Sequence, residues 1–428
     1  MNQGKYIFSQ LTDFLPKIKF DWLVKKYEGN KYVKKFTCWN HLLVMIFAQL
    51  TQRESLRDLV STLNAHKSKF NRLGFGEAVT RSNLSKANEQ REARIFEEMA
   101  GYLAQEAREY RIGSASKDSF YEGSVYAFDS TTVSLSLQIF WWSRLHHDKG
   151  AVKMHTLYDV KTDIPSFFVI TNGDVHDSKV MHLIPYEQDA LYIFDRGYMN
   201  TAQLCLIKRI GAFFVVREKR RMTFEVIEDK HHNNPGTGVM ADQTIRFTGA
   251  GTKKRYPDAI RRIVFYDTED NRTFVFYTNN MALSAEEIAL AYKYRWRVEL
   301  FFKWIKQHLH VKEFYGTTEN AVKIQLYCAI ITYCLIAIIE RRMKLDMDIY
   351  EMSRILSISL LERMPLRDLL VPEKAKENLQ SVTQLSLNFF LVDTSETGYM
   401  FHNQIQSAQA LTPDWGLTER AGQPLMGQ

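Results

Sequence analysis

The hydrophobic pattern of the first quarter of the chain predicts helices. Five apolar residues recur at the spacing of one helical face: Leu42, Leu43, Ile46, Phe47 and Leu50. Further short helices are expected over 55–63, 82–87 and 89–103. Residues 1–118 are therefore expected to form an all-helical N-terminal domain.

From about residue 119 the pattern changes to short runs rich in β-branched and aromatic residues. Strands are expected over 124–133, 151–159, 165–171, 190–195 and 212–217, with helical stretches at 178–184 and 200–210. Strands mixed with helices predict an α/β sheet that is covered on both faces. We expect residues 119–217 to form the first part of this domain.

Residues 218–282 carry a second strand pattern, which is more polar and is interrupted by Gly, Asn and Asp. This pattern predicts a β-rich insertion. Helical periodicity resumes near Ser284, so residues 283–345 are expected to complete the interrupted α/β domain. Residues 346–428 are expected to form a helical C-terminal region that ends in a flexible tail.

The most apolar segment of the chain, residues 324–339, raises the question of a membrane anchor. Only Gln325 and Thr332 interrupt it. Because a membrane span needs about 20 apolar residues, the shorter run favours a buried helix. The N-terminus also lacks the basic-then-apolar order of a signal peptide. No membrane partner is expected.

Composition adds a modest indication of a polyanionic partner. The 428 residues are enough for two or three domains. Lys and Arg exceed Asp and Glu by 7, and the pI is about 9.0. Such an excess suits nucleic acid without requiring it. The four cysteines are scattered, which disfavours a Cys-rich zinc site or a disulfide framework and makes the cytoplasm the expected location.

Two aspartates follow apolar strands of the predicted sheet. Asp129 comes after residues 125–128, and Asp195 comes after residues 191–194. The carboxyl ends of strands in an α/β sheet are where ligands bind. A strand-ending Asp also commonly caps a turn, so either residue alone is a weak signal. The chain has no G-x-x-x-x-G-K-[ST] loop, which disfavours a nucleotide-binding ATPase.

A polar stripe follows on the helix that is expected from Ser284. At about 100° per residue, four side chains fall within an arc of roughly 60°: Tyr292, Arg295, Glu299 and Lys306. The alternative is a solvated surface, on which an Arg–Glu pair contributes only a few tenths of a kcal/mol. The neighbouring aromatic residue Trp296 favours a functional site instead.

Three carboxylates on separate elements suit a magnesium site. Mg²⁺ prefers oxygen ligands and is usually held by carboxylates together with substrate phosphates. Two such ions, about 3.5–4 Å apart, can activate a water or a 3′-hydroxyl and stabilise the leaving oxygen. Asp129, Asp195 and Glu299 are therefore candidate ligands for such ions. Arg295 would hold a phosphate by its fork and Lys306 as a point charge.

The motif Tyr292-x2-Arg295-x3-Glu299-x6-Lys306 resembles the Tyr-Arg-Glu-Lys signature of a large group of bacterial insertion-sequence DDE transposases. Asp129, Asp195 and Glu299 resemble that family's two aspartates and glutamate in order and context. The long gap before the glutamate is similar to the β-rich insertion of the group. Further similarities are Gly150-x2-Lys153-x-His155, the segment Gly173-Asp174-Val175-His176-Asp177, and the helical region from Phe8 to Arg91.

The resemblance implies a ribonuclease-H-like mixed sheet flanked by helices, and an enzyme of DNA transposition. Such an enzyme cuts DNA at the ends of an insertion sequence and transfers the freed 3′-hydroxyl into target DNA. Its implied partners are the double-stranded terminal inverted repeats, the target DNA and a second copy of the chain. Asp129, Asp195 and Glu299 would bind two Mg²⁺ ions, for which Mn²⁺ can substitute. Tyr292, Arg295 and Lys306 would contact phosphates near the cut. Trp296 would stack on a flipped base beside a hairpin intermediate.

Several alternatives stay open. Lys153 and His155 either contact DNA or pair with a carboxylate, and Trp296 either stacks on a base or packs against the sheet. The helical domain over residues 1–118 is expected to bind DNA, and Arg81 and Lys86 belong either to a helix that docks on DNA or to an ordinary capped surface helix. A ribonuclease-H-like metal nuclease without strand transfer, or a non-catalytic DNA-binding relative, would share much of this pattern.

Overall fold

The computed structural model describes residues 4–76, 79–112, 120–136, 139–140, 142–146, 149–219, 222–230, 236–269, 271–308 and 314–371. Residues up to Val371 pack as one compact unit, so the predicted boundaries at 118, 217, 282 and 345 stay a prediction. The predicted C-terminal tail lies outside the described residues.

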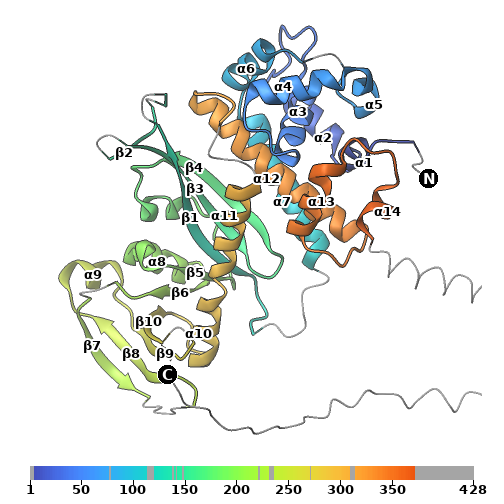
Figure 1. Cartoon of the computed structure of the whole chain (residues 1–428). Coiled ribbons are helices and arrows are strands. Elements are labelled where there is room, and N and C mark those ends of the chain that lie inside the picture. Colours follow the sequence, from blue (N-terminus) through green and yellow to red (C-terminus); the bar gives the residue numbers. More distant parts are fainter. Residues whose placement is uncertain are drawn as a thin grey trace, which may run out of the picture. The chain divides into compact units, whose positions relative to one another are not determined.

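The N-terminal region is helical, as predicted (Figure 1). Its helices are α1 (Ile7–Thr12), α2 (Lys17–Lys26), α3 (Cys38–Leu50), α4 (Leu56–Ala65), η1 (Lys67–Lys69), α5 (Phe70–Leu73), α6 (Arg81–Gln90) and α7 (Arg94–Ile112). Thr37 caps α3, which is buried at every position except Trp39. The five-residue apolar face was thus only part of a helix that is surrounded on nearly all sides.

The central sheet contains every strand that the structure describes. The strands are β1 (Val125–Leu135), β2 (Arg144–His146), β3 (Lys149–Asp159), β4 (Ile164–Asn172), β5 (Leu191–Phe194), β6 (Phe213–Arg217), β7 (Phe224–Asp229), β8 (Val239–Phe247), β9 (Ile260–Asp267) and β10 (Arg272–Thr278). Their order is β2-β3-β1-β5-β6-β10-β9-β8-β7, and β4 pairs with β3. Strands β1, β5 and β6 run parallel, and the other pairs are antiparallel. The insertion therefore extends the sheet, because its last strand, β10, pairs with β6.

Some of the remaining helices connect strands of the sheet, and those from α10 on follow its last strand. They are η2 (Asp177–Lys179), η3 (Met181–Leu183), η4 (Arg196–Tyr198), α8 (Thr201–Arg209), α9 (Ala250–Arg255), α10 (Ala285–Lys293), α11 (Trp296–His308), α12 (Glu319–Arg342), α13 (Ile349–Ser359) and α14 (Leu366–Leu370). The helix expected over 178–184 is instead two short 3₁₀ turns, η2 and η3. The mixed sheet with flanking helices confirms the predicted α/β class.

The most apolar helix is α12, which packs along α7 and α3 (Figure 1). It is long and apolar enough to cross a membrane, but 94% of its most apolar window is buried inside the structure. The prediction of a buried core helix over 324–339 is confirmed.

Alternation along the central strands assigns their residues to two cores. Val125 and Ala127 of β1 belong to the core that includes α11 and α12. Tyr126 and Phe128 belong to the opposite core, which includes α8. Because successive strand residues face opposite sides, Asp129 continues the α11 side of β1. Figure 1 shows α11 lying against β1.

Candidate active site

The two candidate aspartates lie side by side where the parallel pairing of β1 and β5 ends. The two strands pair in register up to Phe128 and Phe194, so Asp129 and Asp195 both follow this last pair. Ile193, two residues before Asp195, belongs to the same core as Ala127. Both carboxylates therefore emerge on the side of the sheet that α11 covers. Asp195 follows the carboxyl end of β5, where α/β proteins bind ligands, and Asp129 lies within β1 beside it.

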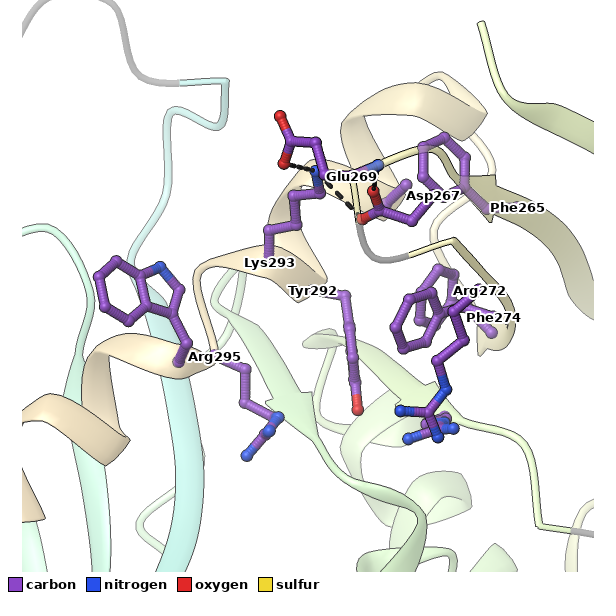
Figure 2. A pocket seen from close by; sticks show the side chains of 12 residues that line it. Phe265, Asp267, Glu269, Arg272, Phe274, Tyr292, Lys293 and Arg295 are labelled. Atoms are coloured by element: carbon purple, nitrogen blue, oxygen red, sulfur yellow. Dashed lines mark hydrogen bonds and ion pairs between the residues drawn. The ribbon is translucent and has the colours of Figure 1, made fainter. Parts of the chain in front are cut away.

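Residues from the α10–α11 segment connect these carboxylates with Glu299. Arg295 donates from Nη1 to Asp129 Oδ2 and from Nη2 to Glu299 Oε1, each at 2.6 Å. The Tyr292 hydroxyl donates to Asp195 Oδ1 at 3.0 Å. Figure 2 shows the side chains of Tyr292 and Arg295 extending in the same direction from this segment. The structure thus brings together five of the predicted site residues.

The segment that carries these residues is two helices, which corrects the expectation of one. The predicted start is confirmed, because Ser284 forms a capping box with Glu287. The first helix, however, ends at Lys293, and the second begins at Trp296. At the junction, the Arg295 amide donates to the Tyr292 carbonyl, which closes a four-residue turn of the 3₁₀ type. Because side chains three residues apart lie one above the other in such a turn, Tyr292 and Arg295 share an orientation without a continuous α-helix.

The carboxyl group of Asp129 is the more buried end of the Arg295 bridge. The Asp129 side chain is 19% exposed and that of Glu299 is 55% exposed. Burial raises the pKa of Asp129 to about 6, and Arg295 opposes this rise. The nearby carboxylates of Glu299 and Asp195 raise the Asp129 pKa further, as like charges do. A cation placed beside Asp129 would favour its charged form.

Two cavities adjoin this cluster. One, of about 700 Å³, is lined by Asp129, Glu299 and the exposed Lys306, among others. Burial lowers the pKa of Lys306. The other cavity, of about 370 Å³, lies between α10 and the insertion (Figure 2). Its lining includes aromatic and basic residues, Phe265, Phe274, Phe276, Tyr292, Trp296, Arg217, Arg272, Lys293 and Arg295, together with the acidic residues Asp267 and Glu269. Trp296 is 53% exposed.

Comparison with known families identifies this region. Residues 121–335, which hold all three carboxylates, match the model of the Transposase DDE domain. The chain belongs to this family. Residues 3–76 match a separate domain of unknown function, DUF4372. The predicted resemblance to bacterial insertion-sequence DDE transposases is confirmed, whereas membership of the Tyr-Arg-Glu-Lys group stays a prediction.

Individual relatives agree with the family assignment. A protein of Sinorhizobium fredii that is named as a transposase, y4zB, is 33% identical over 65% of this chain and 77% of its own length. One of Geobacillus stearothermophilus, named as a probable transposase for insertion sequence element IS5377, is 34% identical over 49% of this chain and 54% of its own length. One of Synechocystis sp., named as a transposase for insertion sequence element IS4SA, is 28% identical over 64% of this chain and 76% of its own length.

Among solved structures, the chain is similar to the piggyBac transposase in a synaptic complex with hairpin DNA. The TM-score is 0.40 at 9% identity, over 86% of this chain and 84% of the other. That likeness is too low to carry an argument about function. The family match and the mixed sheet flanked by helices establish the ribonuclease-H-like fold.

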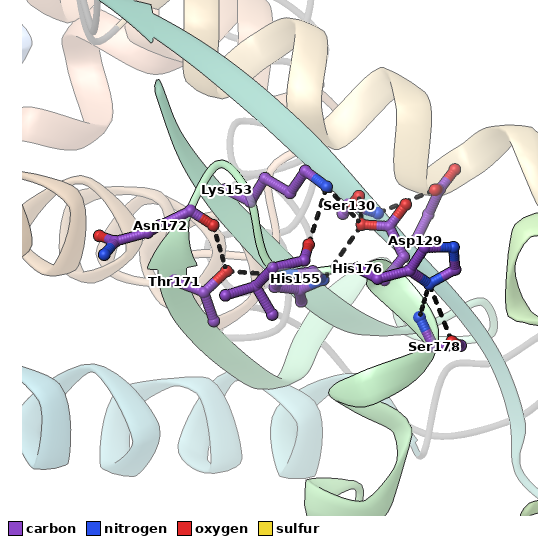
Figure 3. Close-up of polar contacts among 10 residues, drawn as sticks. Asp129, Ser130, Lys153, His155, Thr171, Asn172, His176 and Ser178 are labelled. Carbon is purple, nitrogen blue, oxygen red and sulfur yellow. Dashed lines mark hydrogen bonds and ion pairs between the residues drawn. The ribbon is translucent and has the colours of Figure 1, made fainter. Parts of the chain in front are cut away.

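A second polar cluster of the DDE domain lies on the opposite side of β1 (Figure 3). Lys153 donates from Nζ to Asp177 Oδ1 at 3.2 Å and to the Val175 carbonyl at 2.9 Å. Ser130 Oγ also donates to Asp177 Oδ1, at 3.1 Å. The Ser130 amide in turn donates to Asp129 Oδ1 at 2.8 Å. This cluster therefore fixes the middle of β1 from the face opposite to Asp129.

His155 belongs to the same cluster and is fully buried. Its Nε2 lies 3.0 Å from Thr171 Oγ1, and burial lowers its pKa to about 4. A fully buried, neutral imidazole does not reach DNA in this structure. The DNA contacts predicted for Lys153 and His155 are therefore not part of the function proposed below. The contribution of Asp177 was missed, although the segment Gly173–Asp177 carried the signal.

Arg81 and Lys86 lie on α6, outside the DDE domain match. Both side chains are exposed, and Thr80 caps the helix by accepting from the Asn83 amide. The structure does not bring them to the carboxylates, since neither lines the two cavities above. Lys86 lines a different groove, which is described below.

The carboxylates match a metal site in the chemistry of their donors. They present the hard oxygen ligands that Mg²⁺ prefers. Within the described residues, no three Asp, Glu, His or Cys side chains stand close enough to hold an ion as they are placed. The guanidinium of Arg295 lies between Asp129 and Glu299.

Proposed function

We propose that this chain cuts DNA at the ends of an insertion sequence and joins the freed 3′-hydroxyl to target DNA. The observation that carries the proposal is the convergence of Asp129, Asp195 and Glu299 through Arg295 and Tyr292. Three acidic groups that lie beside one basic and one phenolic side chain are suited to phosphoryl transfer. Membership of the DDE family supports the same chemistry.

The carboxylates would hold two divalent ions, Mg²⁺ or Mn²⁺. When bound, such ions lower the pKa of the attacking oxygen and stabilise the leaving oxygen. Asp129, Asp195 and Glu299 would hold these ions through their carboxylate oxygens. Arg295 bonds one oxygen each of Asp129 and Glu299, and its fork has the geometry that would also bind a DNA phosphate.

The other signature residues would position the DNA. Lys306 lies on the cavity shared with Asp129 and Glu299, where its ammonium can hold a phosphate. Tyr292 orients Asp195 through its hydroxyl, and burial raises the Tyr292 pKa to about 12, which keeps that proton in place. Trp296 presents a half-exposed indole beside the aromatic cavity.

The test is an assay with fluorescent duplexes that end in the inverted repeats flanking the coding region. With Mg²⁺, we expect cleavage at the element end and, from pre-cut ends, covalent joining to a target plasmid. Cleavage without joining would show a metal nuclease. Binding without either reaction would show a non-catalytic relative. A cooperative dependence on protein concentration is expected, because two ends must be joined by two copies of the chain.

Trp296 and its cavity also support a hairpin intermediate. Stacking of a base on an aromatic ring contributes about 1–3 kcal/mol. We expect denaturing gels to show covalently closed element ends, and fewer of them with Trp296→Ala. Only open ends in the wild type would remove the hairpin from the proposal.

A further inference from the structure

A separate groove of about 590 Å³ crosses the N-terminal helical region. One wall is the segment 27–36, which joins α2 to α3, and the other wall is α6. The first wall lies within the domain of unknown function, residues 3–76. The groove shares no lining residue with the two cavities beside the carboxylates.

Both walls are fixed by hydrogen bonds from buried groups. Arg91 is 8% exposed and donates to the carbonyls of Phe36 and Thr37, the latter at 2.9 Å. Asn320 of α12 donates to the Arg91 carbonyl at 2.6 Å. Because these bonds tie the end of α6 to the segment 27–36, the groove is formed before any ligand arrives.

The α6 wall presents a face of base-reading side chains. The helix buries Leu84, Ala87 and Asn88, which leaves the opposite side exposed. Asn83, Lys86 and Gln90 line the groove at spacings of three and four residues, the spacing of one helical face. Asn and Gln amides bind adenine edges with a paired donor and acceptor, and Lys binds guanine edges or phosphates.

The groove also has an excess of positive charge. Its lining includes five basic residues: Lys31, Lys34, Lys35, Lys86 and Arg91. Its two acidic residues are already paired, Glu28 with Lys31 at 2.6 Å and Glu92 with Arg94 at 3.0 Å. Neither Lys34 nor Lys86 has an ion-pair partner in the part of the chain that the structure describes. Such a surface attracts a polyanion.

An aromatic side chain stands at the edge of this charged wall. Tyr32 is 93% exposed and has a φ of 60°, a left-handed conformation that is uncommon for a bulky residue. The turn is held by the amides of Lys31 and Val33, which donate to the carbonyls of Glu28 and Asn30. An exposed ring beside lysines is suited to stacking on a sugar or a base.

We propose that this groove recognises the element's own DNA ends, with its lysines on the phosphates and Asn83 and Gln90 on base edges. The proposal rests on the proposed function. It gives α6 a role in choosing the DNA that the carboxylates cut and the segment 27–36 a role in holding its phosphates. Arg81, in the first turn of α6, adds a further cation near the same wall.

The experiment measures DNA binding by fluorescence anisotropy with the full chain in EDTA, where no cleavage occurs. The probes are a duplex of the flanking inverted repeat and a scrambled duplex of equal composition, over a range of KCl. Lys34→Gln with Lys86→Gln should weaken both duplexes about tenfold or more and lower the salt slope by about 2, since each phosphate contact contributes about 0.9. Asn83→Ala with Gln90→Ala should weaken only the repeat duplex, about tenfold or more.

The matched control is Lys25→Gln with Lys67→Gln, which removes two exposed lysines outside the groove. If the groove lysine pair binds DNA as this control does, the groove does not hold DNA and fits another partner. If Asn83→Ala with Gln90→Ala weakens both duplexes equally, it does not read bases. Melting by circular dichroism verifies that each variant is folded.

Cleavage by the wild type in Mg²⁺ separates this inference from the proposed function. If the wild type cleaves DNA and the groove variants still bind DNA normally, only the proposed role of the groove would be overturned. Loss of binding in those variants, from a wild type that never cleaves, would overturn the proposed chemistry and leave the groove as a DNA site.

Discussion

The two faces of β1 around Asp129 and Ser130 differ in how completely the charges on them are balanced. On one face, Asp129 shares Arg295 with Glu299 and adjoins a cavity of about 700 Å³. On the other, Asp177 accepts hydrogen bonds from Lys153 and Ser130. The two faces are only one residue apart in sequence, since Asp129 and Ser130 are neighbours.

This difference indicates that Asp129 can exchange its partner for another cation, whereas Asp177 holds the backbone in place. Burial raises the pKa of Asp129 to about 6, so its negative charge is poorly compensated in the protein alone. Asp177 instead serves neutral and cationic donors of β1 and β3. We therefore expect substitutions on the first face to change chemistry and those on the second to change stability.

The largest effect is expected for Glu299→Gln. Loss of one metal-binding charge should lower the rate of DNA cleavage about 10³-fold or more, while DNA binding in EDTA stays nearly unchanged. Gel assays of cleavage and anisotropy of binding measure the two quantities. Glu286→Gln, an exposed residue on α10, is the control and should cleave normally. Retained cleavage in Glu299→Gln would falsify the assignment of this carboxylate.

Arg295→Lys should come next, with a loss of cleavage of about 10²-fold. The charge is kept, but the fork that spans Asp129 and Glu299 at 2.6 Å, and that would bind a phosphate, is lost. The control is Arg297→Lys, because Arg297 bonds to the Val160 carbonyl and to Asp163, away from the carboxylates. Equal activity of the two variants would show that only charge matters at position 295.

Asp129→Asn tests the first face through pH. A raised pKa means that the folded protein holds the proton more tightly than the unfolded chain, whose pKa is near 3.8. The stability linked to Asp129 is therefore present below about pH 4 and is lost as pH rises through about 6. In EDTA, the free energy of unfolding of Asp129→Asn should exceed that of the wild type by on the order of 2–3 kcal/mol at pH 7. At pH 4 the two free energies should differ little, because Asp129 is then protonated in the folded wild type.

Urea unfolding at the two pH values gives these free energies. A variant that is less stable than the wild type at pH 7 would show that Arg295 compensates the Asp129 charge fully, and the contrast between the two faces would disappear.

Asp177→Asn should change the free energy of unfolding in the opposite direction to Asp129→Asn, and its effect should be the smallest of the four. It weakens the bonds from Lys153 and Ser130, so the free energy of unfolding should fall by about 1–3 kcal/mol. Cleavage should fall only modestly at temperatures where the variant is folded. Asp174→Asn, an exposed residue of the same segment, is the matched control. A large loss of cleavage without a loss of stability would place Asp177 in the chemistry.

Local patterns predicted the parts of this site that depend on local structure. Asp129 and Asp195 each follow an uninterrupted apolar run, and such runs formed the paired strands β1 and β5. Ser284 and Glu287 have the spacing of a capping box, which marked the start of α10. The family signature then indicated that Glu299 joins the two aspartates.

The features that were missed depend on contacts between distant segments. No Gly or Pro marks the break between α10 and α11. Tyr294 stacks on Phe120 at a ring separation of 5.5 Å, and Arg297 donates to the Val160 carbonyl at 2.7 Å. Lys153 likewise lies on the same face as Ser130 only because β1 and β3 pair in a given register, Ser130 with His155 and Thr132 with Lys153. A one-residue shift in that register would place these side chains on the other face.

Crystals of the full chain with its element-end duplex and Mn²⁺ provide the most direct measurement, because manganese scatters anomalously. The account predicts anomalous peaks in contact with Asp129, Asp195 and Glu299, and the Arg295 guanidinium turned from Asp129 toward a DNA phosphate. Bound manganese away from these three carboxylates, with Arg295 still bridging Asp129 and Glu299 in a complex that cleaves DNA, would contradict it.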